Sequence, residues 1–302
     1  MMMFKMTDIV GDGMPMISVL DIGAMPEGQP RYAPLLEQDL ADVIGFEPQP
    51  AQRMLLDSEA RKSRRYLPHV LGSGAKGYLH ITRYPGCTSL YEPDPAVIDI
   101  FTNMVASTPE GNFFVKEKVV VQTEKLDDAL AEFDNSFAPD FLKIDVQGAE
   151  LDVLQNGISA LDSVLVLETE AEFIPLYKEQ PLFCDIQAFL RERGFVLHKF
   201  IDVGGRAFRP LRQENPYVPL SQLLWADAVF VRDFCNPDGY ADLDLLKAAL
   251  IAHELYWSID LAAYYLGILD KRGNTDYQKR YIGALQKEPQ LHLMFLNIRQ
   301  HG

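Results

Sequence analysis

Along residues 17–232, short apolar runs alternate with segments in which apolar residues recur every three or four positions. The runs are bounded by glycine, proline or charged residues, which is the pattern of buried strands. The segments between them are typical of amphipathic helices, and the one at 182–194 closes with Gly194. Strands that alternate with helices predict an α/β fold, with a mostly parallel sheet and helices on both faces.

The predicted strands differ in their expected burial. Continuous apolar runs such as "VLVLET" indicate strands covered on both faces, whereas "GYLHITR" and "KVVVQT" alternate and indicate strands near an edge. The last two strands are joined by a long segment without a clear crossover helix, which predicts an antiparallel edge pair. The predicted strands are 17–23, 42–48, 66–72, 77–83, 118–123, 140–145, 163–169, 195–202 and 226–233.

After Asp233 the pattern becomes helical throughout. We therefore predict an N-terminal extension at 1–16, a sheet domain at 17–233 and a helical module at 234–302. Tyrosine and leucine residues at helical spacing predict that this module has a small core of its own. A homodimer contact through the same stripe is the functional alternative.

Composition restricts the class of protein and its partners. The net charge is -15 and the pI about 4.8, so most of the surface would repel a nucleic-acid backbone. The basic cluster at 61–65 fits either a solvated helix end or a docking site for an anionic substrate. No apolar run approaches the roughly 20 residues of a membrane span, and residues 1–16 lack a signal-peptide pattern, so we expect a cytoplasmic protein. The three cysteines form no CxxC pair, so neither a disulfide framework nor a zinc site is indicated.

Carboxylates and glycines gather where the predicted strands end. In an open α/β sheet the carboxyl ends of the strands are the edge at which ligands bind. The residues there are Asp21, Gly23, Ala24 and Gly28 after the first strand, Glu47 and Pro48 after the second, Asp145 after the strand near 140, and Glu168 after the strand near 163.

The spacing of these residues points to a nucleoside-containing cofactor. Glu47 lies 19 residues after Gly28, close to the roughly 20 expected for an acid that accepts hydrogen bonds from a ribose diol. The turn has no full GxGxxG and carries Glu27, so a pyrophosphate would find little to hold it. A cofactor with ribose and adenine but no phosphate fits better, namely S-adenosylmethionine. An ordinary α/β turn with a surface glutamate is the alternative.

The segment "LKIDVQGAELDVLQNG" (142–157) follows "VVVQTEKLDDAL" and precedes "VLVLETE". Together they closely resemble the FkbM family of S-adenosylmethionine-dependent methyltransferases, and "VLDIGA", "GFEPQP" and "GCTSLYEP" are similar to other motifs of that family. The resemblance covers roughly residues 17–232. It implies a class I methyltransferase (Rossmann-like) fold and O-methylation of a hydroxyl on a glycan or a natural product. The turn "GAMPEG" departs from the family's G-A-N-x-G pattern, being one residue longer and without the asparagine.

The resemblance also assigns roles to particular residues. Asp21, Gly23, Ala24 and Gly28 would contact the methionine end of the cofactor, and Glu47, followed by Pro48, would hold the ribose. Asp145 would lie beside the sulfonium and the substrate. Its carboxylate is the candidate catalytic base for a hydroxyl nucleophile, or else an acceptor that orients it.

Other residues of these segments have structural or functional interpretations. Asp145 and Glu168 could bind a divalent cation if their strands are neighbours, although no third ligand is evident. The loop at 82–95 offers Thr88, Ser89 and Tyr91 as polar contacts to a substrate, and an ordinary surface loop is the alternative. Around Asp145 we predict structural roles, namely a paired ammonium for Lys143, a tight turn at Gln147 and Gly148, and a helix-dipole contact for Glu150.

Two other classes of function are consistent with parts of the sequence. A nicotinamide-dependent oxidoreductase on a similar sheet would need a richer glycine turn. A non-catalytic assembly protein would use the helical module and carry a degenerate cofactor site. If the chain is a methyltransferase, its acceptor is a small molecule or a glycan rather than nucleic acid.

Overall fold

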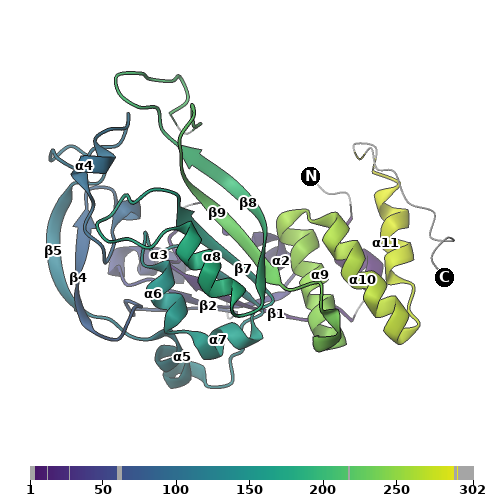
Figure 1. Cartoon of the computed structure of the whole chain (residues 1–302). Helices are drawn as coiled ribbons and strands as arrows, with labels where there is room; N and C mark the ends of the chain where they lie inside the picture. The colour runs from purple at the N-terminus through teal and green to yellow at the C-terminus, as the bar shows by residue number, and fades with distance from the viewer. Residues whose placement is uncertain are drawn as a thin grey trace. The chain divides into compact units, whose positions relative to one another are not determined.

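The computed structural model describes residues 4–11, 13–26, 28–59, 63–216, 218–288 and 291. The chain divides into two compact units (Figure 1). The sheet unit comprises Ile17–Pro30 and Ala41–Cys235, and the helical unit comprises Met1–Met16, Arg31–Leu40 and Asn236–Gly302.

A seven-stranded sheet forms the centre of the sheet unit, in the order β3-β2-β1-β6-β7-β9-β8. The first five strands in that order are parallel, and β9 is antiparallel to both β7 and β8. The fold is therefore α/β with a mostly parallel sheet, and the predicted antiparallel edge pair is confirmed. The strands are β1 (Ile17–Ile22), β2 (Ala41–Phe46), β3 (Arg64–Leu67), β6 (Phe141–Ile144), β7 (Val166–Glu172), β8 (Phe195–Gly205) and β9 (Leu223–Arg232).

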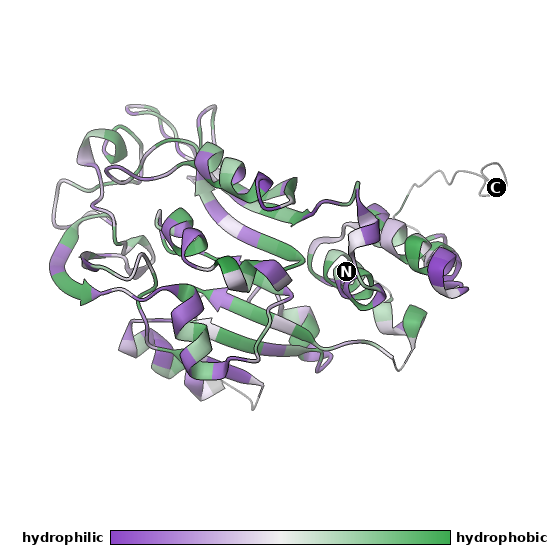
Figure 2. Ribbon diagram, turned by 60° about the horizontal axis from the view of Figure 1, so that its bottom comes forward, coloured by the Kyte–Doolittle hydropathy of each residue, from purple (hydrophilic) through white to green (hydrophobic). Residues whose placement is uncertain are grey.

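Helices between the strands cover the sheet with their apolar sides. One core cluster joins Leu20, Ile144 and Leu167 of the strands to Leu126 and Val153 of the helices. Figure 2 shows hydrophobic stretches along the strands and mixed hydrophilic and hydrophobic sides on the helices. The helices of this unit are α3 (Pro50–Glu59), α4 (Pro95–Ile98), α5 (Leu126–Asp134), α6 (Glu150–Gln155), α7 (Ile158–Ser163), α8 (Phe183–Arg191) and the short 3₁₀ turn η1 (Pro85–Cys87).

Four of the predicted strands differ from the structure in their partner or their bounds. The alternating segments form a separate two-stranded antiparallel sheet, β4 (Lys76–Thr82) with β5 (Val115–Gln122), instead of edges of the main sheet. The third strand is β3 and ends at Leu67, directly before Pro68, which has no backbone N–H for a sheet ladder. The strand predicted at 163–169 is β7, which begins at Val166 and continues to Glu172, so Glu168 lies within the strand and not at its end.

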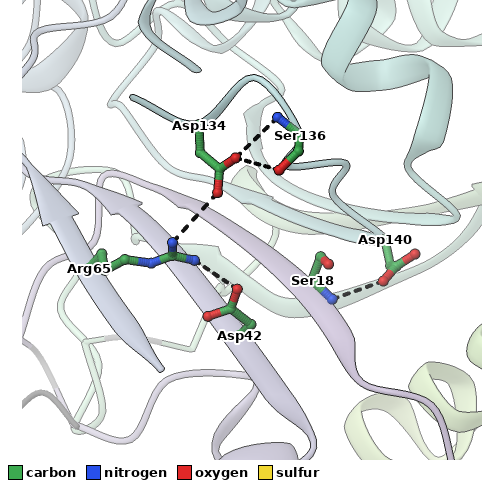
Figure 3. A network of polar contacts seen from close by, with 6 residues as sticks. All are labelled: Ser18, Asp42, Arg65, Asp134, Ser136 and Asp140. Atoms are coloured by element: carbon green, nitrogen blue, oxygen red, sulfur yellow. Dashed lines mark hydrogen bonds and ion pairs between the residues drawn. The ribbon is translucent and has the colours of Figure 1, made fainter. Parts of the chain in front are cut away.

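The basic cluster at 61–65 only partly falls within the described residues, since residues 61–62 lie outside them. Arg65 lies in β3 and donates to Asp42 of β2 with an Nη2 to Oδ2 distance of 2.7 Å, while Nη1 lies 3.7 Å from Asp134 (Figure 3). The prediction of a solvated helix end is therefore wrong for Arg65, which ties two strands and the end of α5 together.

Figure 3 also shows how β1 is fixed to β6 at the start of both strands. The backbone N–H of Ser18 donates to Asp140 Oδ2 at 2.8 Å, and the backbone N–H of Asp140 donates to the carbonyl of Ser18 at 2.8 Å. This reciprocal pair sets the register in which Asp21 lies opposite Lys143 and Ile22 opposite Ile144.

The helical unit combines the C-terminal helices with two short helices from the beginning of the chain. Its buried polar contacts join distant segments: His253 Nδ1 lies 2.7 Å from the Tyr281 hydroxyl, and Glu254 accepts from the Met6 backbone N–H and from Gln38 Nε2. No helix in the described part of the chain combines the length and apolar character needed to span a membrane. The helices here are α1 (Met6–Val10), α2 (Ala33–Glu37), α9 (Asp242–Tyr256), α10 (Ile259–Gly273) and α11 (Tyr277–Leu285), with the turn η2 (Pro237–Gly239).

Candidate functional site

The turn after β1 is held tightly against the ends of β2 and β6. The backbone N–H groups of Gly23 and Ala24 donate to the Phe46 carbonyl at 3.0 and 3.1 Å, and that of Asp145 donates to the Ile22 carbonyl at 2.9 Å. Gly23 has a φ of +79°, and a Cβ at this position would lie 1.8 Å from the Asp145 carbonyl oxygen. Only glycine allows both the conformation and the close approach.

Glu47 is a buried carboxyl group at the end of β2, with 3% of its surface exposed. Its Oε1 accepts from the Gln49 backbone N–H at 2.6 Å, and its second oxygen makes no hydrogen bond to a described residue. Burial raises the pKa of Glu47 to about 7, although the Gln49 N–H and Arg53 act in the opposite direction. A ligand with two hydroxyl donors, such as a ribose, would satisfy this carboxylate in place of water. Pro48 follows directly and prevents the strand from pairing further.

Lys143 lies among several acids on the same face of the sheet. Its Nζ is 3.9 Å from Asp145 Oδ2, so the predicted pairing of the ammonium is confirmed. Burial would lower the pKa of Lys143, but Asp145, Asp21, Glu168 and Asp227 outweigh it and raise that pKa. Asp21 and Glu168 occupy the register positions on either side of Lys143, where their negative charges compensate the buried cation.

The register of β6 and β7 decides which acid lies next to Asp145. Ile144 pairs with Thr169, so Asp145 follows at the level of Glu170, two residues beyond Glu168. The strands of Asp145 and Glu168 are neighbours, as their predicted pairing required, but Glu168 lies within β7 and not at its end. Glu170 takes the place beside Asp145. Among the described residues, no group of three or more histidines, cysteines or acids is arranged to hold a metal ion.

The loop at 82–95 lies against this edge through its hydroxyl groups. Ser89 is 1% exposed, and its Oγ donates to the Gln147 carbonyl at 2.6 Å and accepts from the Tyr91 backbone N–H at 2.9 Å. The Tyr91 hydroxyl donates to Asp152 at 2.9 Å, and Thr88 Oγ1 accepts from the backbone N–H of Thr82 at 3.3 Å. These hydroxyls fix the loop, and their role as substrate contacts stays a prediction.

Gln147 and Glu170 are functional candidates that the sequence analysis missed. Gln147 makes the tight turn as predicted, with a φ of +57°. Its Nε2 also donates to Asp145 Oδ1 at 2.9 Å and to Glu170 Oε2 at 2.6 Å. The signal for Glu170 was present in "VLETEAE", where acids at every second position place Glu168, Glu170 and Glu172 on one face of a strand.

Most of the residues predicted for the cofactor site lie close together. Asp21, Gly23, Ala24, Glu47 and Asp145 come together at the carboxyl ends of β1, β2 and β6, next to the point where the strand order reverses. Gly28 lies in the turn after β1 with a φ of +74°. Glu27 in the same turn lies outside the described residues.

Glu150 begins α6 and supports the turn that carries Gln147. Its Oε1 accepts from the backbone N–H groups of Val146 and Gly148 at 2.8 and 3.1 Å. Burial raises the pKa of Glu150 to about 7 against the effect of these hydrogen bonds. Its structural role is therefore to close the turn, in addition to any contact with the helix dipole.

Comparison with known proteins places the chain in a family. The solved structures that match at low identity include "Structure of a putative methyltransferase from Thermoplasma acidophilum" (11% identity, 73% of this chain, 70% of that chain, TM-score 0.35) and an uncharacterized protein from Listeria monocytogenes serotype 4b (10% identity, 93% of this chain, 97% of that chain, TM-score 0.34). No curated protein matches. The model of the methyltransferase FkbM domain matches residues 21–197, more than half of the chain. The chain therefore belongs to the FkbM methyltransferase family.

Proposed function

We propose that the protein is an S-adenosylmethionine-dependent O-methyltransferase that acts on a hydroxyl group of a small molecule or a glycan. The observation that carries the proposal is the buried Glu47 carboxylate beside the Gly23–Ala24 turn, with Asp145 at the end of the adjoining strand. A buried acid with an unused oxygen at this edge is suited to a ribose, and the family supplies the methyl-transfer chemistry.

The turn also favours this cofactor over a dinucleotide. A pyrophosphate is normally held by free backbone N–H groups of a glycine-rich turn at a helix start. Here the N–H groups of Gly23 and Ala24 both donate to the Phe46 carbonyl, so they are already used within the protein. The residues present fit a ribose and an uncharged adenine better than they fit a chain of phosphates.

S-adenosylmethionine, when bound, supplies a methyl group on a sulfonium sulfur. The acceptor hydroxyl must be aligned with that methyl group and lose its proton. Asp145 is placed to accept the proton or to orient the hydroxyl, because its carboxylate is half-buried and held from two sides, by Gln147 Nε2 and by Lys143. Alignment supplies much of the rate in a one-step displacement, and a positioned base adds about 10²–10⁴-fold.

Calorimetric titration of the full chain with S-adenosylmethionine, S-adenosylhomocysteine and NAD tests the proposal. Binding of the first two is expected. Glu47→Ala should weaken it by at least about tenfold, since it removes hydrogen bonds to a charged group. Glu132→Ala, the same change on the exposed surface of α5, is the matched control and should bind normally.

The other outcomes are equally informative. Binding of NAD alone would refute the proposal in favour of an oxidoreductase. Binding of none of the three ligands would favour an assembly protein and direct attention to residues 234–302, for which a homodimer contact stays a prediction.

A further inference from the structure

Hydrogen bonds to the main chain and to both ends of the side-chain amide fix the orientation of Gln147. Its main-chain carbonyl accepts from Ser89 Oγ at 2.6 Å, and its Oε1 accepts from the Tyr177 hydroxyl at 3.0 Å. With Oε1 used in this way, the amide nitrogen must face the opposite direction, where it donates one hydrogen to Asp145 and the other to Glu170. One amide group therefore bridges two carboxyl groups from neighbouring strands.

The surroundings of Glu170 are dominated by acids from every neighbouring element. These are Asp145 at the end of β6, Glu150 of α6, Glu172 of β7 and Asp227 of β9. Lys143 Nζ lies 3.9 Å from Asp145 Oδ2. The buried Tyr177 hydroxyl is close enough to Glu170 for the charge of that carboxyl group to raise the pKa of Tyr177. Burial and then these carboxylates raise the pKa of Glu170 well above its usual value, which favours the protonated form of this carboxyl group.

A third acid, Glu172, extends the same face and has one unsatisfied carboxyl oxygen. Glu172 is buried, and its Oε2 makes no hydrogen bond to a described residue. The unsatisfied oxygen can accept a hydrogen bond, and the carboxyl groups at this edge outnumber the cations, so the edge is suited to a ligand that carries positive charge.

Resting on the proposed function, we propose that Gln147 is a positioning residue that holds Asp145 and Glu170 as a proton-carrying pair, and that the pair ionises when a cationic methyl donor binds. In this step the O–H bond of Glu170 breaks and the proton passes to the buffer. The new carboxylate keeps its bond to Gln147 Nε2 and adds one negative charge to this edge, which would favour a cationic ligand. S-adenosylhomocysteine has no sulfonium, so its binding leaves Glu170 protonated.

Proton release can be counted directly, without a methyl acceptor. The full chain is titrated at pH 7 with S-adenosylmethionine and with S-adenosylhomocysteine, in buffers of different ionisation enthalpy. We expect about one more proton released with the sulfonium ligand than with its product. The affinity for S-adenosylmethionine should also rise more steeply with pH across the neutral range than that for S-adenosylhomocysteine, because the sulfonium ligand releases one more proton.

Variants assign the proton to the pair. Glu170→Gln should abolish the difference in proton release, and Glu132→Gln on the exposed face of α5 should leave it intact. Gln147→Leu should lower the affinity for S-adenosylmethionine about tenfold and leave that for S-adenosylhomocysteine almost unchanged. A purely structural defect would weaken both ligands equally.

The inference and the function fail in different ways. Equal proton release by the two ligands in the unaltered chain, or release that persists in Glu170→Gln, would overturn the inference and leave the methyltransferase intact. Failure of both ligands to bind the unaltered chain would overturn the proposed function, and with it the inference.

Discussion

Two glycines in the turn after β1 share a left-handed backbone but differ in their surroundings, which makes them a matched pair. Gly23 has a φ of +79° and Gly28 a φ of +74°. A Cβ at Gly23 would lie 1.8 Å from the Asp145 carbonyl oxygen, whereas a Cβ at Gly28 would meet no described residue within 4 Å apart from its own chain neighbours. Alanine at either position therefore adds the same conformational strain, and alanine at Gly23 adds a clash with the end of β6.

The expected losses of stability follow from this geometry. Holding alanine in the left-handed region costs about 1–2 kcal/mol, which is the whole effect at Gly28. An ordinary carbon–oxygen contact is about 3.3 Å, so at Gly23 the ends of β1 and β6 must also separate by about 1.5 Å. The 2.9 Å hydrogen bond from Asp145 to the Ile22 carbonyl would then break. The backbone strain, the lost hydrogen bond and the repacking add up, so we expect Gly23→Ala to lower the free energy of unfolding by about 3–5 kcal/mol.

Urea unfolding of the full chain, followed by tryptophan fluorescence and circular dichroism, measures both losses. With a slope of about 2 kcal/mol per molar urea, the midpoint should fall by about 2 M for Gly23→Ala and by less than about 1 M for Gly28→Ala. Trp225 in β9 reports on the sheet unit. Equal midpoints for the two variants would show that the close approach of the strand ends is not a constraint, and the account of Gly23 given above would be wrong.

Three further predictions concern buried or paired side chains. Because the pKa of Glu47 is raised to about 7, its stabilising contribution is complete below about pH 4.5 and is lost as the pH rises through 7. In the unaltered chain the unfolding free energy should therefore fall between these pH values. Glu47→Gln should reduce that fall by up to about 3 kcal/mol, as measured by urea unfolding at a series of pH values. Tyr281→Phe leaves His253 Nδ1 buried without its partner, so thermal and urea unfolding should show a loss of about 1–3 kcal/mol. A double-mutant cycle on Arg65→Ala and Asp42→Ala should give a coupling below about 1 kcal/mol, because both side chains are about one third exposed, and a coupling above 2 kcal/mol would contradict this estimate.

The strands whose carboxyl ends form the candidate site were predictable because local and global signals agree in them. β1, β2 and β6 are short, mostly apolar, largely buried on both faces and stopped by glycine, proline or a charged turn. Such strands have one way to be buried, namely in the interior of a covered parallel sheet. Their ends must then meet at one edge, so the proximity of Asp21, Glu47 and Asp145 followed from topology alone.

The alternating strands could not be placed by the same reasoning. Alternation in β4 and β5 correctly indicates that each strand has one exposed face. It does not say which strand is its partner, because hydrogen bonding between strands uses backbone groups that are the same in every residue. The two strands pair with each other in a separate sheet, and the loop between β4 and α4 reaches the candidate site through the bond from Ser89 to the Gln147 carbonyl.

The acids of β7 show a different limit. A strand with glutamate at every second position is typical of a half-exposed strand, and that pattern gives no reason to expect buried carboxyl groups. In the structure Glu168 is balanced by Lys143, but Glu170 and Glu172 are held by neutral amide and backbone groups instead of cations. Burying such acids as carboxylates costs folding free energy unless a cation or a proton neutralises them. An arrangement of this kind at the ligand edge is unfavourable for folding alone, which is the physical reason to assign Glu170 a role in binding a cation.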